Sequence, residues 1–243
     1  MTGDGARRGA AARIAVALDG LDAAGALRLV DSLGELARVF KVGPSLALAS
    51  GASVIADLRA RGKDVFLDLK LHDIPQSVGA AVAEAGRLGV SLLTLHASGG
   101  RAMLRAARAA APERDGPRLL AVTVLTSLDA AALRETLGEA AAGPEALALR
   151  LARLARDEGV DGVVASGREA RALRVALGPG ALIVTPGIRA PGEPAGDQRR
   201  TLSASEAIAE GADLLVVGRP IVAAASPRDA FREIQDEIEA AAR

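Results

Sequence analysis

Cysteine, tryptophan and tyrosine are absent from this chain of 243 residues, and phenylalanine occurs only three times. Without cysteine the chain has no disulfide, no thiolate ligand for a metal and no thiol nucleophile, which suits a reducing cytosol. The scarcity of aromatic rings also removes the stacking surfaces on which single-stranded nucleic acids bind. These absences exclude disulfide-stapled domains and cysteine-dependent enzymes.

An excess of charge of either sign is missing too, because 30 Lys and Arg residues balance 30 Asp and Glu residues. A neutral chain has no electrostatic attraction to nucleic acid or to an anionic membrane. No apolar run approaches the roughly 18 to 20 residues of a membrane span, and Arg13 interrupts the N-terminal segment before a signal-peptide core develops. We expect a soluble, cytoplasmic protein with a flexible tail at residues 1–12 and one domain at residues 13–243.

Lysine is rare among the basic residues: Lys41, Lys63 and Lys70 are the only three, and the other 27 are arginine. A coding bias accounts for the many arginines. A lysine that persists in such a chain is a candidate for a role that needs a compact, titratable ammonium group. Lys41 and Lys70 lie in segments that strengthen this interpretation, whereas we expect Lys63 to be solvated.

Short apolar runs alternate with amphipathic segments along the chain. The runs are nearly continuous and rich in Val, Ile and Leu, as in strands that helices cover on both faces. They are Ile14–Leu18, Val39–Val42, Val65–Leu69, Ser91–Leu95, Leu119–Val124, Gly162–Ala165, Ala181–Thr185 and Leu214–Val217. The segments between them predict helices, for example Ala23–Ala37, Ser45–Arg61, Gln76–Leu88, Arg101–Ala110, Pro144–Glu158 and Glu169–Leu177.

This alternation predicts an α/β fold of one domain, a (β/α)8 TIM barrel, since the number of runs and the chain length both fit that architecture. A doubly wound open sheet is the alternative. The chain contains neither the G-x-G-x-x-G turn nor the G-x-x-x-x-G-K-S/T loop that would support it. We expect insertions at Ser127–Gly143 and a long loop at Ala190–Arg200.

Polar residues follow the predicted strands, where the active sites of such barrels are built. In chain order they are Asp19, Lys41, Asp68, Lys70, Asp73, His96, Thr126, Ser127, Ser166, Gly187, Arg189, Gly218 and Arg219. Any single polar residue in such a place is ordinary. The set is less ordinary, because it brings three carboxylates and two of the three lysines to one rim.

The densest polar segment follows the third predicted strand. Asp68 and Lys70 are two residues apart, so both point to one face, while Leu67 and Leu69 point to the other, towards the helices. Charges inside a barrel must pair, and neighbouring carboxylates favour a protonated lysine. We therefore interpret Lys70 as a general acid or an electrostatic stabiliser; a buried ion-pair network without catalysis is the alternative.

A glycine and an arginine follow each of the last two predicted strands. The loops after these strands commonly hold a phosphate group in TIM barrels. Gly187 and Gly218 allow close backbone approach, and Arg189 and Arg219 offer guanidinium forks. Gln198, in the predicted loop, adds a neutral donor. The alternative is that the glycines merely end strands and the arginines are solvated.

The segment Asp68-Leu-Lys-Leu-His-Asp-Ile-Pro75 resembles the signature of the orotidine 5′-phosphate decarboxylase family, in particular of its short bacterial members. The resemblance extends in the same order over nearly the whole chain from about Arg13. Its other segments are Ala17–Asp19, Phe40–Gly43, Leu95–Ala97, Leu125–Ser127, Thr185–Arg189, Asp197–Gln198 and Val217–Arg219. Gln76 departs from the pattern, where a hydroxyl residue is expected.

The resemblance implies a metal-free and cofactor-free decarboxylation of orotidine 5′-phosphate to UMP in pyrimidine biosynthesis. It implies that Lys70 donates the proton, between Asp68 and an Asp73 contributed by the partner subunit of a homodimer. It further implies that Lys41 completes the charged chain and holds the ribose hydroxyls together with Asp19. The remaining substrate contacts that it implies are Thr126 and Ser127 near the ribose and base, and Arg189, Gln198, Gly218 and Arg219 at the phosphate. His72 and a hydrogen-bonded His96 are expected to be structural.

Two other functions remain open from the sequence. A Mg²⁺-dependent sugar-phosphate decarboxylase or aldolase similar to hexulose-phosphate synthase shares the Asp-x-Lys-x-x-Asp spacing and the phosphate rim. Ile74-Pro75 and Leu125-Thr126-Ser127 favour the pyrimidine enzyme over it. A phosphate-ligand binding protein without activity is the more remote alternative, because the lysines and carboxylates are intact.

Overall fold

The computed structural model describes residues 9–112, 116–138, 143–188 and 202–241. Parallel strands close into one barrel in chain order, β1 beside β2 and so on until β8 pairs with β1. The strands are β1 (Ile14–Ala17), β2 (Val39–Val42), β3 (Asp64–Leu71), β4 (Leu92–His96), β5 (Arg118–Val122), β6 (Gly162–Val164), β7 (Leu182–Thr185) and β8 (Leu214–Val217). The predicted (β/α)8 fold is confirmed.

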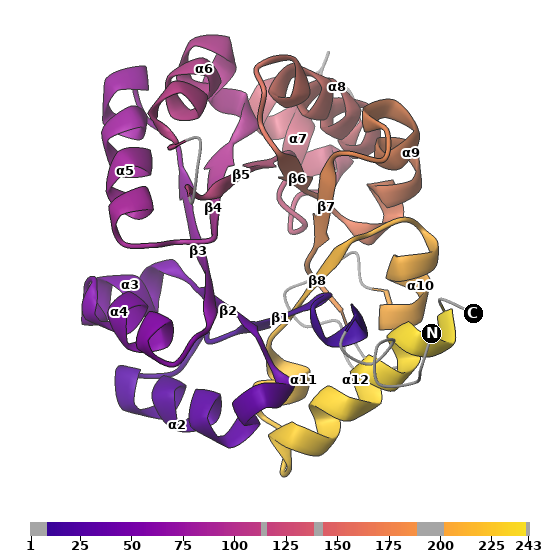
Figure 1. Ribbon diagram of the computed structural model, residues 1–243. Coiled ribbons are helices and arrows are strands. Elements are labelled where there is room, and N and C mark those ends of the chain that lie inside the picture. Colours follow the sequence, from indigo (N-terminus) through magenta and orange to yellow (C-terminus); the bar gives the residue numbers. More distant parts are fainter. Residues whose placement is uncertain (1–8, 113–115, 139–142, 189–201, 242–243) are drawn as a thin grey trace.

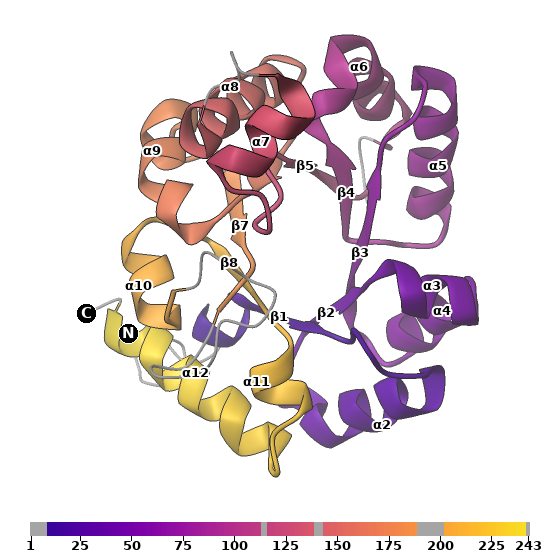
Figure 2. The same ribbon diagram turned by 180° about the vertical axis from the view of Figure 1, so that it is seen from behind.

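Helices surround the barrel on its outside (Figures 1 and 2). They are α2 (Ala23–Leu33), α3 (Pro44–Ser50), α4 (Ser53–Ala60), α5 (Pro75–Arg87), α6 (Gly100–Ala110), α7 (Ala130–Leu137), α8 (Pro144–Asp157), α9 (Gly167–Leu177), α10 (Ala204–Ala209), α11 (Arg219–Val222) and α12 (Pro227–Ala241), with the short 3-10 segments η1 (Gly34–Leu36) and η2 (Ala97–Gly99).

Two of these elements differ from the sequence-based prediction. The single helix expected over Ser45–Arg61 is two helices, because Gly51 takes a φ of +57° and ends α3. The insertion expected at Ser127–Gly143 contains α7, whose first turn is capped by the Asp129 carboxylate accepting the Ala132 N–H at 2.9 Å. A short capped helix in a region without a long apolar stripe is hard to see from periodicity alone.

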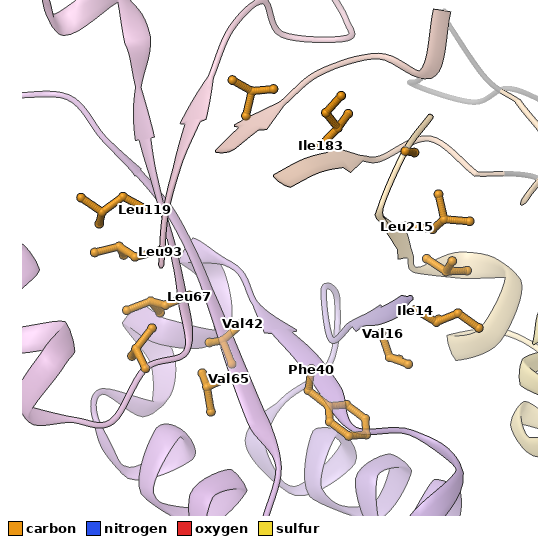
Figure 3. Packing of buried hydrophobic residues seen from close by; sticks show 14 of the residues in the cluster. Ile14, Val16, Phe40, Val42, Val65, Leu67, Leu93, Leu119, Ile183 and Leu215 are labelled. Carbon is orange, nitrogen blue, oxygen red and sulfur yellow. The ribbon is translucent and has the colours of Figure 1, made fainter. Parts of the chain in front are cut away.

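Apolar side chains form two layers on the two faces of the strands. An inner cluster fills the barrel and contains Ala15, Phe66, Leu120 and Val216 among others. A larger outer cluster packs between the strands and the helices, and Figure 3 shows members of it such as Phe40. Burial on both faces explains why the strands are continuous apolar runs.

Strand β3 is longer than its neighbours and irregular near its carboxyl end. Leu67 pairs with Leu93 and Leu71 pairs with Leu95, so four steps along β3 match two steps along β4. Within this bulge Lys70 has a φ of +50°, the only positive φ of a non-glycine residue in the described parts of the chain. The irregularity sets where the side chains after Asp68 point.

The N-terminal boundary and Lys63 also differ from expectation. Residues 1–8 of the predicted tail lie outside the described residues, but residues 9–11 are helical and Ala10 is buried in the outer cluster. Lys63 is not solvated, and that prediction is wrong. It is buried, and its Nζ donates to the carbonyls of Gly34 at 2.7 Å and Ala37 at 3.2 Å, acceptors left open where the helical segment ends.

Among the described helices none has the length and apolar character needed to cross a membrane.

Candidate active site

The carboxyl ends of the strands surround a cavity of about 610 Å³. Polar residues from both halves of the barrel line it, namely Asp19, Lys41, Asp68, Lys70, Thr126 and Arg219. Phe66, Val122 and Val216 give it an apolar floor. Much of the predicted rim therefore surrounds one pocket, which is large enough for a nucleotide-sized ligand.

Two carboxylates and two ammonium groups lie in contact with one another in this cavity. They come from the turn after β1 and from β2 and β3. The Nζ of Lys41 lies 2.8 Å from the Asp19 Oδ2 and 3.3 Å from the Asp68 Oδ2. The Nζ of Lys70 lies 2.9 Å from the same Asp68 oxygen. Negative and positive charges therefore alternate in the order Asp19, Lys41, Asp68 and Lys70. Every charge has a partner of opposite sign.

Burial differs strongly along this chain of charges. The side chains of Lys41 and Asp68 are only 7% and 11% exposed, whereas that of Lys70 is 34% exposed and that of Asp19 is 57% exposed. The inner pair therefore anchors the network. The outer two groups, Asp19 and Lys70, are more accessible from the cavity that they line.

The carboxylate of Asp68 is held in its ionised form. Burial raises the pKa of Asp68, but the charges of Lys41 and Lys70 and the hydrogen bonds from Lys70 and Thr94 outweigh it, so the pKa lies below the ordinary value. Asp68 is consequently a fixed negative charge beside the Lys70 ammonium group.

Thr94 on β4 is a site residue that the sequence analysis missed. Its side chain is fully buried, its Oγ1 accepts the backbone N–H of Lys70 at 2.9 Å, and its hydroxyl donates to the Asp68 Oδ1 at 2.9 Å. A threonine inside an apolar strand run gives no signal of this role. Only the register of β3 against β4 reveals it.

Gly43 is a second residue whose role emerges only from the geometry. A Cβ at this position would lie 2.3 Å from the Asp19 Oδ1 and 3.4 Å from the Lys41 Nζ. The absence of a side chain therefore leaves the space in which the Asp19 carboxylate meets Lys41.

The structure describes three of the residues predicted to surround the phosphate, namely Gly187, Gly218 and Arg219. All three line the same cavity as the charged chain. A Cβ at Gly218 would meet only the Ala17 Cβ, at 3.6 Å, so packing within the protein does not require glycine there. Arg189 and Gln198 lie outside the described residues.

Thr126 and Ser127 have different positions. Thr126 lines the cavity, as expected. Ser127 is exposed and does not belong to the cavity wall of this chain. Its expected contact with the base remains a prediction.

Asp73 does not reach the Lys70 of its own chain. It is exposed, its Oδ1 accepts the neighbouring Ile74 N–H at 2.6 Å, and no ion pair within the described ranges joins it to a lysine. Ile74 beside it is 64% exposed. The segment therefore projects from the barrel rather than into its own cavity.

The two histidines contact each other near this segment. The rings of His72 and His96 are 5.2 Å apart between centroids. Partial burial, followed by the neighbouring His72 and Lys70, lowers the pKa of His96 below its ordinary value. His96 is thus a neutral, half-buried ring at neutral pH, and the hydrogen bond expected for it remains a prediction.

No cluster of three or more His, Asp or Glu side chains able to hold a metal ion occurs within the described parts of the chain.

Comparisons with known proteins agree with one another. The profile described as "Orotidine 5'-phosphate decarboxylase / HUMPS family" matches residues 12–234. The chain is 50% identical over 233 residues to an orotidine 5′-phosphate decarboxylase of Moorella thermoacetica, covering 93% of this chain and 92% of that protein. It is 47% identical over 226 residues to one of Chromobacterium violaceum, covering 93% and 91% of the two chains.

The chain belongs to the orotidine 5′-phosphate decarboxylase / HUMPS family. Solved structures support the assignment. A crystal structure of the orotidine 5′-phosphate decarboxylase from Lactobacillus acidophilus superposes with a TM-score of 0.81 at 34% identity, covering 93% of this chain and 98% of that one. The enzyme from Pyrococcus horikoshii gives 0.75 at 28% identity, covering 93% and 98%. The comparisons thus confirm the family that the sequence motifs indicated.

Proposed function

We propose that this chain converts orotidine 5′-phosphate to UMP and CO2. The observation that carries the proposal is the alternating chain of Asp19, Lys41, Asp68 and Lys70 along one wall of the cavity. Relatives named for this activity cover more than nine-tenths of the chain, which favours it over other reactions of the same scaffold.

The reaction breaks the bond between C6 of the pyrimidine and its carboxylate group. The bonding electron pair stays on C6, where the ring π-system does not delocalise it, and CO2 leaves. A fixed ammonium group next to C6 stabilises this charge without reorganisation, and Lys70 then donates a proton to C6. Asp68 holds the Lys70 ammonium from the side at 2.9 Å.

The other residues of the cavity are suited to bind the parts of the substrate that lie away from C6, namely the ribose, the base and the phosphate. In this proposal Asp19 and Lys41 exchange hydrogen bonds with the ribose hydroxyls, and Thr126 and Ser127 contact the ribose and base. Arg219 and Gly218, with Arg189 and Gln198, bind the phosphate in this proposal. Binding energy from the remote phosphate then lowers the barrier at C6.

We further propose that the active unit is a homodimer in which Asp73 completes the site of the partner subunit. The support is that Asp73 and the exposed Ile74 project away from the cavity of their own chain. A second copy would cover Ile74 and bring a third carboxylate to the network. The cytoplasmic location stays a prediction.

The test is to follow the ultraviolet change as orotidine 5′-phosphate becomes UMP in the presence of the purified chain. The proposal expects turnover that a metal chelator does not reduce. Turnover that stops with the chelator and returns with Mg²⁺ would instead favour the sugar-phosphate enzymes that use the carboxylates to bind magnesium. Binding of the nucleotide without turnover would leave a phosphate-ligand binding protein.

A further inference from the structure

The bulge of β3 leaves a backbone donor without its regular strand partner. At Lys70 the φ of +50° turns the N–H out of the ladder to β4, and four residues of β3 span two residues of β4. This N–H is directed at a side chain instead, the Thr94 hydroxyl at 2.9 Å. A non-glycine residue in the left-handed region is strained, so the surrounding contacts must hold it there.

The same hydroxyl also binds the carboxylate that faces Lys70. The Thr94 Oγ1 donates to the Asp68 Oδ1 at 2.9 Å, while the other oxygen, Oδ2, contacts the Lys70 Nζ at 2.9 Å and the Lys41 Nζ at 3.3 Å. One atom therefore joins the backbone of Lys70 to the side chain of Asp68. Only a group that both accepts and donates is able to do so, and a hydroxyl is the smallest such group.

We infer that Thr94 is a positioning residue for the proposed decarboxylation, on which this inference rests. Its hydroxyl holds the Lys70 backbone in its strained conformation and fixes the rotation of the Asp68 carboxylate. Both effects determine where the Lys70 ammonium group lies above the reacting carbon. Thr94 does not line the cavity, so it acts only through Asp68 and Lys70.

The matched variants are Thr94→Val, which keeps the shape and removes the hydroxyl, and Thr94→Ser, which keeps the hydroxyl. A hydrogen bond to a charged group is worth enough that we expect Thr94→Val to lower kcat roughly 10- to 100-fold. Affinity for UMP should stay within about threefold of wild type, because the ligand contacts remain. Thr94→Ser should restore kcat to within about threefold of wild type.

A second readout does not depend on turnover. The Thr94 hydroxyl donates to the ionised carboxylate, so its removal should raise the pKa of Asp68, measured by NMR of the carboxyl carbon. Thr94→Ser should leave that pKa near the wild-type value. If wild type fails to turn over orotidine 5′-phosphate, the proposed function is wrong, and this measurement still tests the contact.

Thr123→Val is the control for loss of a buried threonine hydroxyl. Thr123 is also buried, but its hydroxyl donates to the Val164 carbonyl at 3.2 Å, outside the charged network. It should change thermal stability and leave kcat unaltered. The inference is overturned if Thr94→Val keeps the wild-type kcat and Asp68 pKa, if Thr94→Ser is as impaired as Thr94→Val, or if UMP affinity falls in step with kcat. It is also overturned if neither Thr94→Val nor Thr94→Ala folds, since Thr94 would then serve the fold.

Discussion

At the scale of single residues, each of the three lysines in this arginine-rich chain has its ammonium group in contact with carboxylate or carbonyl oxygens. Lys41 contacts two carboxylates, Lys70 contacts one beside the cavity, and Lys63 contacts two backbone carbonyls. A compact ammonium fits such close sets of acceptors better than a planar guanidinium. The rarity of lysine singled out Lys41 and Lys70, which the structure places in one ion-pair network. It gave no reason to bury Lys63, whose acceptors come from a distant helix end.

Replacing Lys70 tests the centre of the proposed chemistry. Lys70→Ala removes the ammonium group that is to stabilise the charge on C6 and supply the proton. Loss of one preorganised charge should lower kcat by at least ~10²- to 10³-fold. The fold should survive, because Lys70 is partly exposed and its backbone bond to Thr94 remains. Steady-state kinetics and circular dichroism provide the check, and decarboxylation near the wild-type rate would refute the assignment.

A methyl group at Gly43 tests the space next to Asp19. In Gly43→Ala the new Cβ would lie 2.3 Å from the Asp19 Oδ1, so the exposed carboxylate must swing away from Lys41. Because the clashing atom is the end of a movable side chain, stability should change little. We expect KM to rise roughly tenfold, about 1.4 kcal/mol of lost binding.

The matched control for Gly43→Ala is the same substitution in an Asp19→Ala background. With the carboxylate already absent, the added methyl should have little further effect on KM. Equal effects in both backgrounds would mean that Gly43 acts on something other than Asp19.

At the scale of elements, the alternation of inward and outward side chains along β3 could be predicted from the sequence, but the bulge of this strand could not. The pattern from Val65 to Leu71 correctly assigns Asp68 to the inner face and the leucines to the outer clusters. The left-handed conformation of Lys70 arises from the pairing of β3 with β4, which is not local in sequence. Thr94 and Gly43 escaped the sequence analysis for the same reason: each acts on a residue that lies far away along the chain.

Strand β6 begins at Gly162, where the close approach of strand β7 leaves no room for a side chain. A Cβ at Gly162 would lie 2.2 Å from the carbonyl oxygen of Leu182 on β7, a backbone atom that is not free to rotate away. Gly162→Ala should therefore lower the free energy of unfolding by about 1 to 3 kcal/mol, measured by urea denaturation. Gly180→Ala, where nothing lies within 4 Å of the new Cβ, should change it by less than about 0.5 kcal/mol. Similar losses for both variants would contradict this explanation.

Helix α11 begins at Arg219, one of the residues that we propose to bind the phosphate. Arg219→Ala should lower kcat/KM for orotidine 5′-phosphate roughly 10- to 100-fold, because a charge-assisted contact is lost. Part of the loss should be in kcat, since remote binding energy is used in the transition state. Orotidine without its phosphate should be a poor substrate that is indifferent to the substitution. If both substrates suffer equally, Arg219 does not bind the phosphate.

At the scale of the whole molecule, closure of the barrel brings residues from β1 and β8 to one cavity. The alternation of apolar runs and helices predicts this arrangement, so the end of the barrel that carries the candidate site follows from the sequence. The proposed homodimer adds a second level of organisation. In that proposal the exposed Asp73 and Ile74 act at the site of a second copy.

Complementation between two inactive variants tests the shared site. If Asp73 acts across the dimer, a mixture of Lys70→Ala and Asp73→Ala chains forms mixed dimers with one intact site each. Random reassortment makes about half of the dimers mixed, so activity should recover to roughly a quarter of wild type per site. Subunit exchange is verified by native mass spectrometry of differently tagged chains. No recovery after verified exchange would place Asp73 within its own chain.

The location of the charged network along the chain has a consequence for how the barrel is assembled. Asp19, Lys41, Asp68 and Lys70 all come from β1 to β3 and the turn after β1, two negative charges against two positive ones. The ion pairs of this network are thus complete within the first three strands and the turn after β1. The second half of the barrel, which carries Gly218 and Arg219, does not have to supply a compensating charge for these pairs.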